Sequence, residues 1–211
     1  MGSRFDSPID SLRFLLKFSR SIDALTERVG RSVCWLVLAA VLISALNAGV
    51  RKTFNVGSNS WLEVQWYLFS AIFLLGAGYT LLRNEHVRID VVSGRLSAKA
   101  RAWIDLFGLV FFLLPVCSLT GWLSWPFFLD AFSRGEMSSN AGGLVRWPAK
   151  LLIPVGFALL VVQAFSEMIK RAAFLMDLAA DPTDRRLRKT AEQELIEAIA
   201  PKSEAQKTHG V

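Results

Sequence analysis

The hydrophobic residues of this chain are gathered into four long blocks and are not spaced as in amphipathic surface helices or strands. The blocks cover residues 33–50, 61–82, 102–129 and 147–169. Each approaches the ~20 apolar residues that a helix needs to cross a bilayer. Because these blocks hold most of the apolar residues, little remains from which to build a water-soluble core. The pattern therefore predicts an all-α integral membrane protein whose residues 30–175 form a domain of four transmembrane helices.

The third block is too long for a straight crossing. A helix over residues 102–129 would extend ~42 Å at ~1.5 Å per residue, against a hydrocarbon core of ~30 Å. Pro115 and Pro126 lie within it, and proline disrupts the hydrogen-bond ladder of a helix. The third helix is therefore expected to tilt, kink or project from the membrane.

The segments on either side of these blocks are polar. Residues 1–29 are predicted to be a cytoplasmic segment with a separate amphipathic helix over residues 9–29. Its apolar positions fall near one face: Leu12, Leu15, Leu16, Ile22, Leu25 and Val29. A basic helix of this kind either lies in the interface against membrane lipid or packs on a partner's cytoplasmic surface. Residues 176–211 are predicted to be a cytoplasmic tail, first helical and then disordered.

The distribution of basic residues predicts the orientation. Nineteen of the 24 Lys and Arg residues lie in the N-terminal segment, the second loop and the tail, and five lie in the first and third loops. The positive-inside rule then places both termini in the cytoplasm. The net charge of +6 is explained by this asymmetry, so nucleic acid is not an expected partner.

Residues with catalytic or ligand chemistry are sparse. His86 and His209 lie outside the apolar blocks, and Cys34 and Cys117 fall at different depths. No phosphate-binding loop, nucleophile elbow or zinc-protease motif occurs in the sequence. We therefore expect no enzyme activity, no catalytic residues, no cofactor and no metal. A further group of polar residues lies within or near the blocks: Asn47, Glu63, Gln65, Asp105, Gln163 and Glu167. Most of them lie within two turns of the end of a block, where a side chain can reach water or headgroups.

Two placements predict helix packing. Ala40, Ser44 and Ala48 form a stripe of small residues on the first helix with Asn47 beside it, a pattern typical of a close helix–helix contact. We assign this stripe to a subunit interface. Glu167 and Arg171 lie four residues apart and are expected to form an ion pair at the inner end of the fourth helix.

The segment "RNEHVRID", residues 83–90, places a dense cluster of charges directly after the second block. A metal site, a proton site and a structural clamp are the alternatives. One His between Glu and Asp residues does not fix three metal ligands on one side, and charges of alternating sign can pair with a neighbouring subunit. We favour a clamp at a subunit interface formed by Arg83, Glu85, His86, Arg88 and Asp90.

Two stretches of the chain resemble the small membrane subunit (DctQ-like, Q-type) of tripartite ATP-independent periplasmic (TRAP) transporters. They are "NEHVRIDVV", residues 84–92, and "GEMSSNAGGLVRWPAKLLIPVGFALLVVQAFSEMIK", residues 135–170, and the resemblance covers about residues 30–172. It implies a scaffold subunit that supports a large membrane subunit in sodium-coupled, binding-protein-dependent import of organic acid anions across the bacterial inner membrane. The substrate and sodium sites would lie in the large subunit.

The resemblance also implies roles for particular residues. His86, Val87 and Asp90 match the motif after the second helix and are candidates for contacts with the large subunit. The outer-loop pattern is matched by Glu136, Ser138, Ser139, Asn140, Gly142 and Gly143. These residues either form a local turn or provide a rim on which the periplasmic substrate-binding protein docks.

Two other functions remain possible from the sequence. A four-helix chain could act alone as an oligomeric carrier or channel, or it could anchor a membrane enzyme or electron-transfer centre. The identity of the substrate is not specified by this chain.

Overall fold

A computed structural model describes residues 8–55, 57–83 and 96–179, with the backbone alone described for residues 8–13. The elements are α1 (Pro8–Phe54), α2 (Asn59–Arg83), α4 (Ala98–Gly108), the π-helix η1 (Leu109–Leu113), α5 (Leu114–Ser133) and α6 (Trp147–Leu175). The described part of the chain contains no strand, only an isolated β-bridge between Met137 and Val145. The predicted tail helix and disorder fall on residues 180–211, which lie outside the described residues.

Four helical segments are long and apolar enough to cross a membrane. They are Phe14–Phe54, Asn59–Arg83, Ala98–Ser133 and Trp147–Leu175. For the described residues, this confirms the expectation of an all-helical fold with four helices long and apolar enough to span a membrane. The first of these segments extends far beyond the predicted block.

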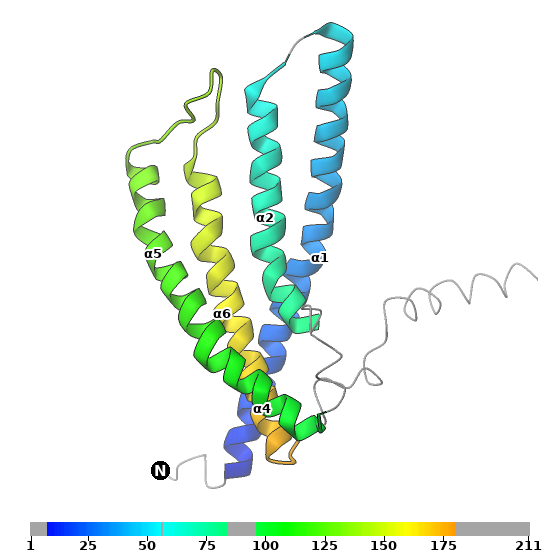
Figure 1. Ribbon diagram of the computed structural model, residues 1–211, viewed down its shortest axis with the longest axis vertical. Coiled ribbons are helices and arrows are strands. Elements are labelled where there is room, and N and C mark those ends of the chain that lie inside the picture. Colours follow the sequence, from blue (N-terminus) through cyan, green and yellow to red (C-terminus); the bar gives the residue numbers. More distant parts are fainter. Residues whose placement is uncertain (1–7, 56, 84–95, 180–211) are drawn as a thin grey trace, which may run out of the picture. The chain divides into compact units, whose positions relative to one another are not determined.

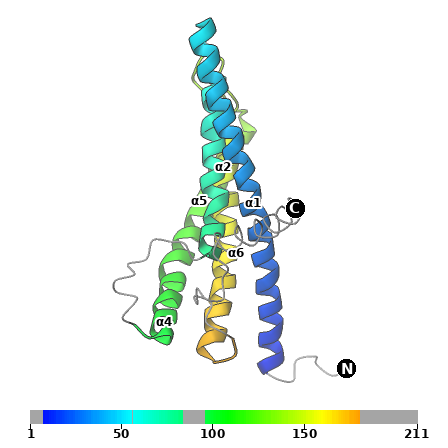
Figure 2. The same ribbon diagram turned by 90° about the vertical axis from the view of Figure 1, so that its right-hand side faces the viewer.

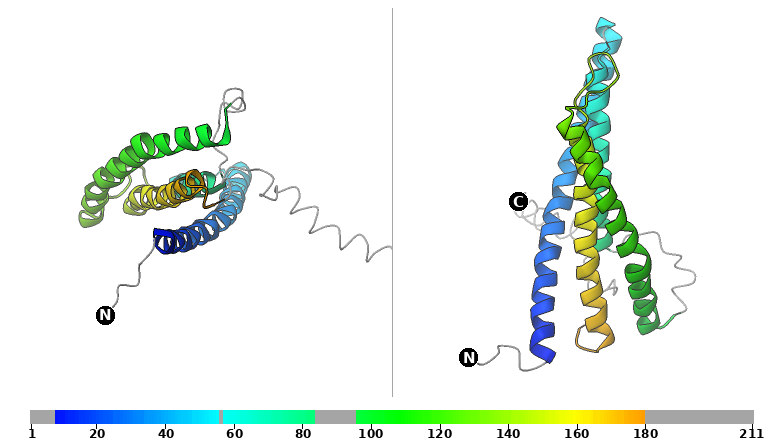
Figure 3. Two further views of the ribbon diagram at one scale, coloured as in Figure 1. Left: turned by 90° about the horizontal axis from the view of Figure 1, so that it is seen from below. Right: turned by 90° about the vertical axis from the view of Figure 1, so that its left-hand side faces the viewer.

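α6 is the central helix of the described bundle. It contacts α1, α2, α4 and α5, and α1 also contacts α2. Seen along the bundle, α6 lies between α1 and the rod formed by α4, η1 and α5 (Figure 3). The beginning of α1 and the end of α6 lie at one end of the bundle, while the α1–α2 and α5–α6 connections lie at the other (Figure 1).

α1 differs from the expectation of a separate helix over residues 9–29. It continues without a break from Pro8 to Phe54 (Figure 2). Gly30 is the one weak helix former near the expected break, and a Cβ there would collide with the Tyr79 ring of α2. A helix of 47 residues is ~70 Å long, so α1 extends well beyond a hydrocarbon core of ~30 Å.

The face of α1 that packs inward near its beginning also differs from the predicted apolar face. Ser19, Ile22 and Thr26 are buried, whereas Leu15 and Leu25 are exposed. This part of α1 therefore turns a largely polar stripe toward the protein and apolar side chains outward. Whether the outward face meets lipid stays a prediction.

The irregularity expected in the third span occurs just before Pro115. Proline has no N–H to donate to the carbonyl four residues earlier, and its ring crowds that carbonyl. The chain responds by a turn of π-helix, in which the Leu114 N–H donates to the Leu109 oxygen. Pro126 and Pro154 lie inside α5 and α6.

Small residues allow the helices to approach α6 closely. A Cβ on Gly156 would lie 2.7 Å from the Leu74 Cβ and 2.9 Å from the Leu74 carbonyl oxygen, so α2 and α6 nearly touch there. Ala131, Ala164 and Ala173 have no exposed surface. The packing is tight enough that a single added methyl group at Gly156 would force the helices apart.

Candidate functional site

Charged side chains of the described helices lie at the two ends of the bundle. Residues 32–50, 64–82, 106–129 and 151–166 carry no charged residue. Two sets of polar contacts flank this charge-free band. One joins α1, α4 and α6 where α1 begins and α6 ends, and the other joins α2 to the α5–α6 loop, residues 134–146.

The first set, which we call the polar cluster, comprises Ser19, Asp23 and Thr26 of α1, Asp105 of α4, and Gln163, Ser166, Glu167, Lys170 and Arg171 of α6. These residues recur every three or four positions on α1 and α6 and so form two facing stripes. Most members on α6 are deeply buried, with exposures of 0% for Gln163, 1% for Glu167 and 2% for Arg171, whereas the Lys170 side chain is 19% exposed. The cluster is therefore part of the protein interior.

Hydrogen bonds between uncharged groups join α1 to α6. The Ser19 and Ser166 hydroxyl oxygens lie 2.7 Å apart, and the Thr26 hydroxyl donates to the Gln163 amide oxygen at 2.7 Å. The Gln163 amide nitrogen in turn donates to Asp23 at 3.0 Å. Buried polar groups cost free energy unless they are paired in this way.

Charged groups complete the polar cluster. Glu167 pairs with both Arg171 and Lys170. The Arg171 Nε lies 3.3 Å from Asp105, and the Lys170 Nζ lies 3.1 Å from Asp23. The predicted Glu167–Arg171 pair is confirmed. The expectation that Gln163 and Glu167 reach water is wrong, because α1 covers their face of α6.

Arg83, the first residue of the predicted charged clamp, makes contacts within the chain. Its guanidinium donates to Glu27 of α1 at 2.6 Å and lies over the Tyr79 ring, 5.2 Å from the ring centre. Glu27 also accepts from Arg31 at 3.2 Å. The other members of the clamp, Glu85, His86, Arg88 and Asp90, lie outside the described residues.

The small-residue stripe of α1 is used partly within the chain. Ala40 is 3% exposed and therefore packs within the chain. The assignment of the stripe to a subunit interface stays a prediction. Ser44 and Asn47 are half-buried and Ala48 is exposed. Only the latter part of the stripe offers surface to another polypeptide.

The second set of contacts fastens the α5–α6 loop onto the first turns of α2. Glu63 accepts hydrogen bonds from the Ser138 hydroxyl, from the Asn140 amide nitrogen at 2.9 Å and from the Leu144 backbone N–H at 2.7 Å. The Tyr67 hydroxyl donates to the Val145 carbonyl at 2.9 Å. One carboxylate thus satisfies three donors of a loop more than seventy residues later in the chain.

Further contacts shape the same loop. The Asn59 amide nitrogen donates to the Ala141 carbonyl at 3.1 Å, and the Ser60 hydroxyl donates to the Gly142 carbonyl. Gly142 has a φ of +69°, which favours glycine, and a Cβ on Gly143 would collide with Ser138. These contacts support the interpretation of the predicted outer-loop residues as a folded turn.

Glu136 fastens the loop to the beginning of α6. It pairs with Lys150 and with Arg146, whose Nη1 lies 3.4 Å away. The hydrogen bond from Lys150 is the main reason that the pKa of Glu136 is lowered below its usual value. Ser139, the remaining predicted docking residue, is exposed. A docking role for the loop stays a prediction.

Among the described residues, no three His, Cys, Asp or Glu side chains lie close enough together to hold a metal ion. Asp23 of α1 and Asp105 of α4 accept from polar and cationic groups of α6, whereas Glu167 accepts from Lys170 and Arg171 of its own helix. Such an arrangement fixes helices relative to one another. The polar cluster was not predicted as a unit from the sequence. Its signal is the recurrence of Ser, Thr, Asp, Gln and Glu at helical spacing on two helices, from which facing polar stripes could have been inferred.

A family model described as "Tripartite ATP-independent periplasmic transporters, DctQ component" matches residues 40–174. The chain belongs to this family. The DctQ match begins inside α1 and ends at the last turn of α6, so the α1 members of the polar cluster precede it, whereas its α4 and α6 members lie within it. Neither a search of curated proteins nor a search of solved structures finds a match. The DctQ family is a family of membrane transporter components and not of enzymes.

Proposed function

We propose that this chain is the small scaffold subunit of a TRAP transporter. In this role it supports a large membrane subunit during sodium-coupled, binding-protein-dependent import of organic acid anions across the bacterial inner membrane. Both termini face the cytoplasm, as the distribution of Lys and Arg favours. Membership in the DctQ family supports the assignment to a TRAP transporter.

The polar cluster is the observation that carries the scaffold role. Moving α1 or α4 relative to α6 would separate Asp23 from Lys170 and Asp105 from Arg171, whose side chain is 2% exposed. Separating one partner of a buried pair costs ~3–5 kcal/mol. At the opposite end of the bundle, three hydrogen bonds to Glu63 hold the α5–α6 loop against α2. A bundle fastened at both ends is suited to remain fixed while a larger neighbour moves.

The charge-free band supports the same role. Asp, Glu, Lys, Arg and His at membrane depth usually mark an ion or substrate path, and the spans carry none of these residues between the two polar ends. Cargo and sodium binding are therefore assigned to the partner. Large exposed aromatic side chains on the band, such as Trp122 (78% exposed), offer apolar surface to lipid and to that partner.

Three finer assignments accompany the proposal. Glu85, His86, Arg88 and Asp90 contact the large subunit, and the α5–α6 loop provides a preformed rim for the substrate-binding protein. The outward face of α1 near its beginning, with Phe14 and Phe18 beside Lys17, contacts membrane lipid or the large subunit.

Reconstitution tests the proposal. The chain is placed in liposomes alone, with a co-expressed large subunit, and with both that subunit and the binding protein, and uptake of labelled organic acids is measured under an inward sodium gradient. We expect uptake only from the complete system. Uptake by this chain alone would instead establish a self-sufficient carrier and refute the scaffold role.

A further inference from the structure

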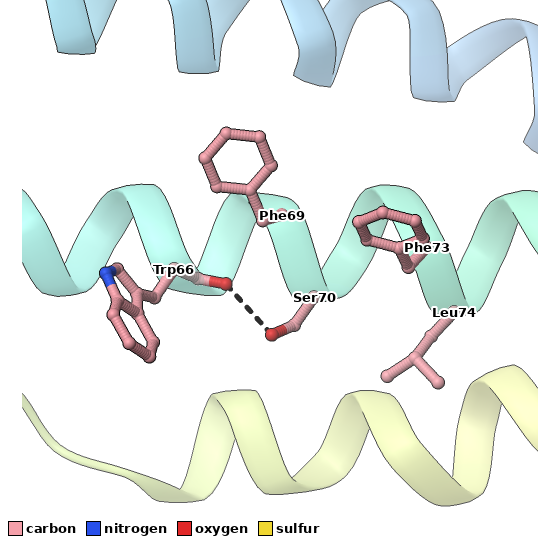
Figure 4. A pocket seen from close by; sticks show the side chains of 5 residues that line it. All are labelled: Trp66, Phe69, Ser70, Phe73 and Leu74. Atoms are coloured by element: carbon pink, nitrogen blue, oxygen red, sulfur yellow. Dashed lines mark hydrogen bonds between the residues drawn. The ribbon is translucent and has the colours of Figure 1, made fainter.

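An open apolar groove runs along α2 within the charge-free band. It is lined by Trp66, Phe69, Ser70, Phe73 and Leu74 and has a volume of about 580 Å³ (Figure 4). Trp66 and Phe73 are 73% and 76% exposed. The Ser70 hydroxyl donates to the Trp66 carbonyl at 2.9 Å, so the polar atom in the lining is satisfied within the helix. The groove therefore presents hydrocarbon and aromatic surface.

A second cavity adjoins the groove at Trp66, on the side of the α5–α6 loop. Its volume is about 450 Å³, it shares Trp66 with the groove, and its other lining residues include Glu63, Tyr67, Arg146 and Lys150. Lys150 is largely buried and paired with Glu136. The Arg146 side chain is 44% exposed and uses Nη1 alone for its 3.4 Å contact with Glu136. A guanidinium has five N–H donors, so Arg146 retains donors for an anionic group.

The two cavities together match an amphiphile. The groove from Trp66 to Leu74 extends ~12 Å along the helix, which is close to the ~15 Å depth of one leaflet. Trp66 lies where the apolar groove meets the polar cavity. Indole side chains favour the membrane interface, which is also the level of the lipid glycerol groups. An apolar helix of a partner would fill the groove but would leave the Arg146 cavity without a matching group.

We propose that the groove and the adjoining cavity bind one phospholipid from the leaflet on the side of the α5–α6 loop. Its acyl chain lies against Phe69 and Phe73, and its phosphate accepts hydrogen bonds from Arg146. This site goes beyond the scaffold role and does not depend on it, since it requires only that the chain span the membrane.

Native mass spectrometry of the full-length chain in a nonionic detergent tests this site. The chain is titrated with palmitoyl-oleoyl phosphatidylethanolamine, and bound lipid is counted. We expect one saturable lipid per chain, with binding weakened on the order of tenfold by either Arg146→Gln or Phe73→Ala. Phe73 has no polar partner and is exposed, so its replacement leaves the fold intact. Matched controls are Arg134→Gln, an exposed loop arginine, and Phe112→Ala, an exposed aromatic residue on η1.

Three results would overturn the proposal. The first is that the cavity variants retain as much lipid as the wild type, or that the control variants lose as much lipid as the cavity variants. The second is displacement of the lipid by excess inorganic phosphate, which would indicate a site for phosphate alone. The third is loss of the lipid upon assembly with a co-purified large subunit, accompanied by a cross-link from Phe73→Cys to that subunit, which would assign the groove to a partner helix.

Discussion

Removing Arg171 should destabilise the protein far more than removing an arginine from an exposed ion pair. In Arg171→Met, Glu167 stays buried with an exposure of 1% and keeps only Lys170 as a cationic partner. Breaking a buried ion pair costs ~3–5 kcal/mol, and because Lys170 remains we expect ~3 kcal/mol. Arg134→Met is the matched control, since Arg134 also pairs with an acid four residues earlier but in an exposed position. Its expected cost is below ~1 kcal/mol.

A double-mutant cycle separates the ion pair from general packing. Replacing both partners, in Arg171→Met with Glu167→Leu, removes the uncompensated charge and should cost less than the sum of the single changes by ~2 kcal/mol. The free energies of unfolding are measured by denaturant titration in mixed micelles, followed by tryptophan fluorescence. If the single costs simply add, Glu167 and Arg171 are not coupled as described. If Arg171→Met costs no more than Arg134→Met, the contacts of Arg171, including its interhelical pair with Asp105, do not stabilise the bundle as described.

Three further outcomes are expected. Gly156→Ala should destabilise the chain by ~1–3 kcal/mol because its Cβ would collide with Leu74, whereas Gly121→Ala, whose Cβ would meet Phe157 at 3.5 Å, should have little effect in the same titration. Glu63→Ala should accelerate hydrogen exchange in the α5–α6 loop, most clearly at the Leu144 amide, and unchanged exchange there would contradict the role of Glu63. Since the folded-state pKa of Glu136 is lowered, its stabilising contribution is present above the ordinary carboxyl pKa of 4.5 and is lost as the pH falls through the lowered value. The difference in melting temperature between the wild type and Glu136→Gln should therefore shrink below pH 4.5. A difference that stays constant with pH would show that the charge of Glu136 does not contribute to stability.

Much of the architecture follows from local sequence. The apolar blocks predict the four spans because a bilayer imposes a minimum length of apolar helix, and Pro115 predicts the irregularity of the third span because proline lacks an N–H. The Glu167–Arg171 pair follows from helix periodicity alone. Each of these features depends on residues that are close together in the chain.

The features that the sequence did not predict depend on residues far apart in the chain. Asp23 and Asp105 join the Glu167–Arg171 pair only because of how α1 and α4 are rotated and aligned against α6. The role of Glu63 likewise requires that the α5–α6 loop fold back onto α2. The continuity of α1 was missed because its inward face near the beginning is polar, and a polar stripe on a helix is normally attributed to solvent.

The most direct test of a fixed scaffold is to lock the helices together during transport. The Ser19 and Ser166 hydroxyl oxygens are 2.7 Å apart, so Ser19→Cys with Ser166→Cys can bridge α1 and α6 by a disulfide, in a background in which Cys34 and Cys117 are replaced by Ala. Uptake is measured in proteoliposomes holding the large subunit and the binding protein, before and after oxidation. The scaffold account predicts the same uptake rate with the disulfide formed. Uptake that stops on oxidation and returns on reduction would show that α1 and α6 move against each other, and would contradict the account.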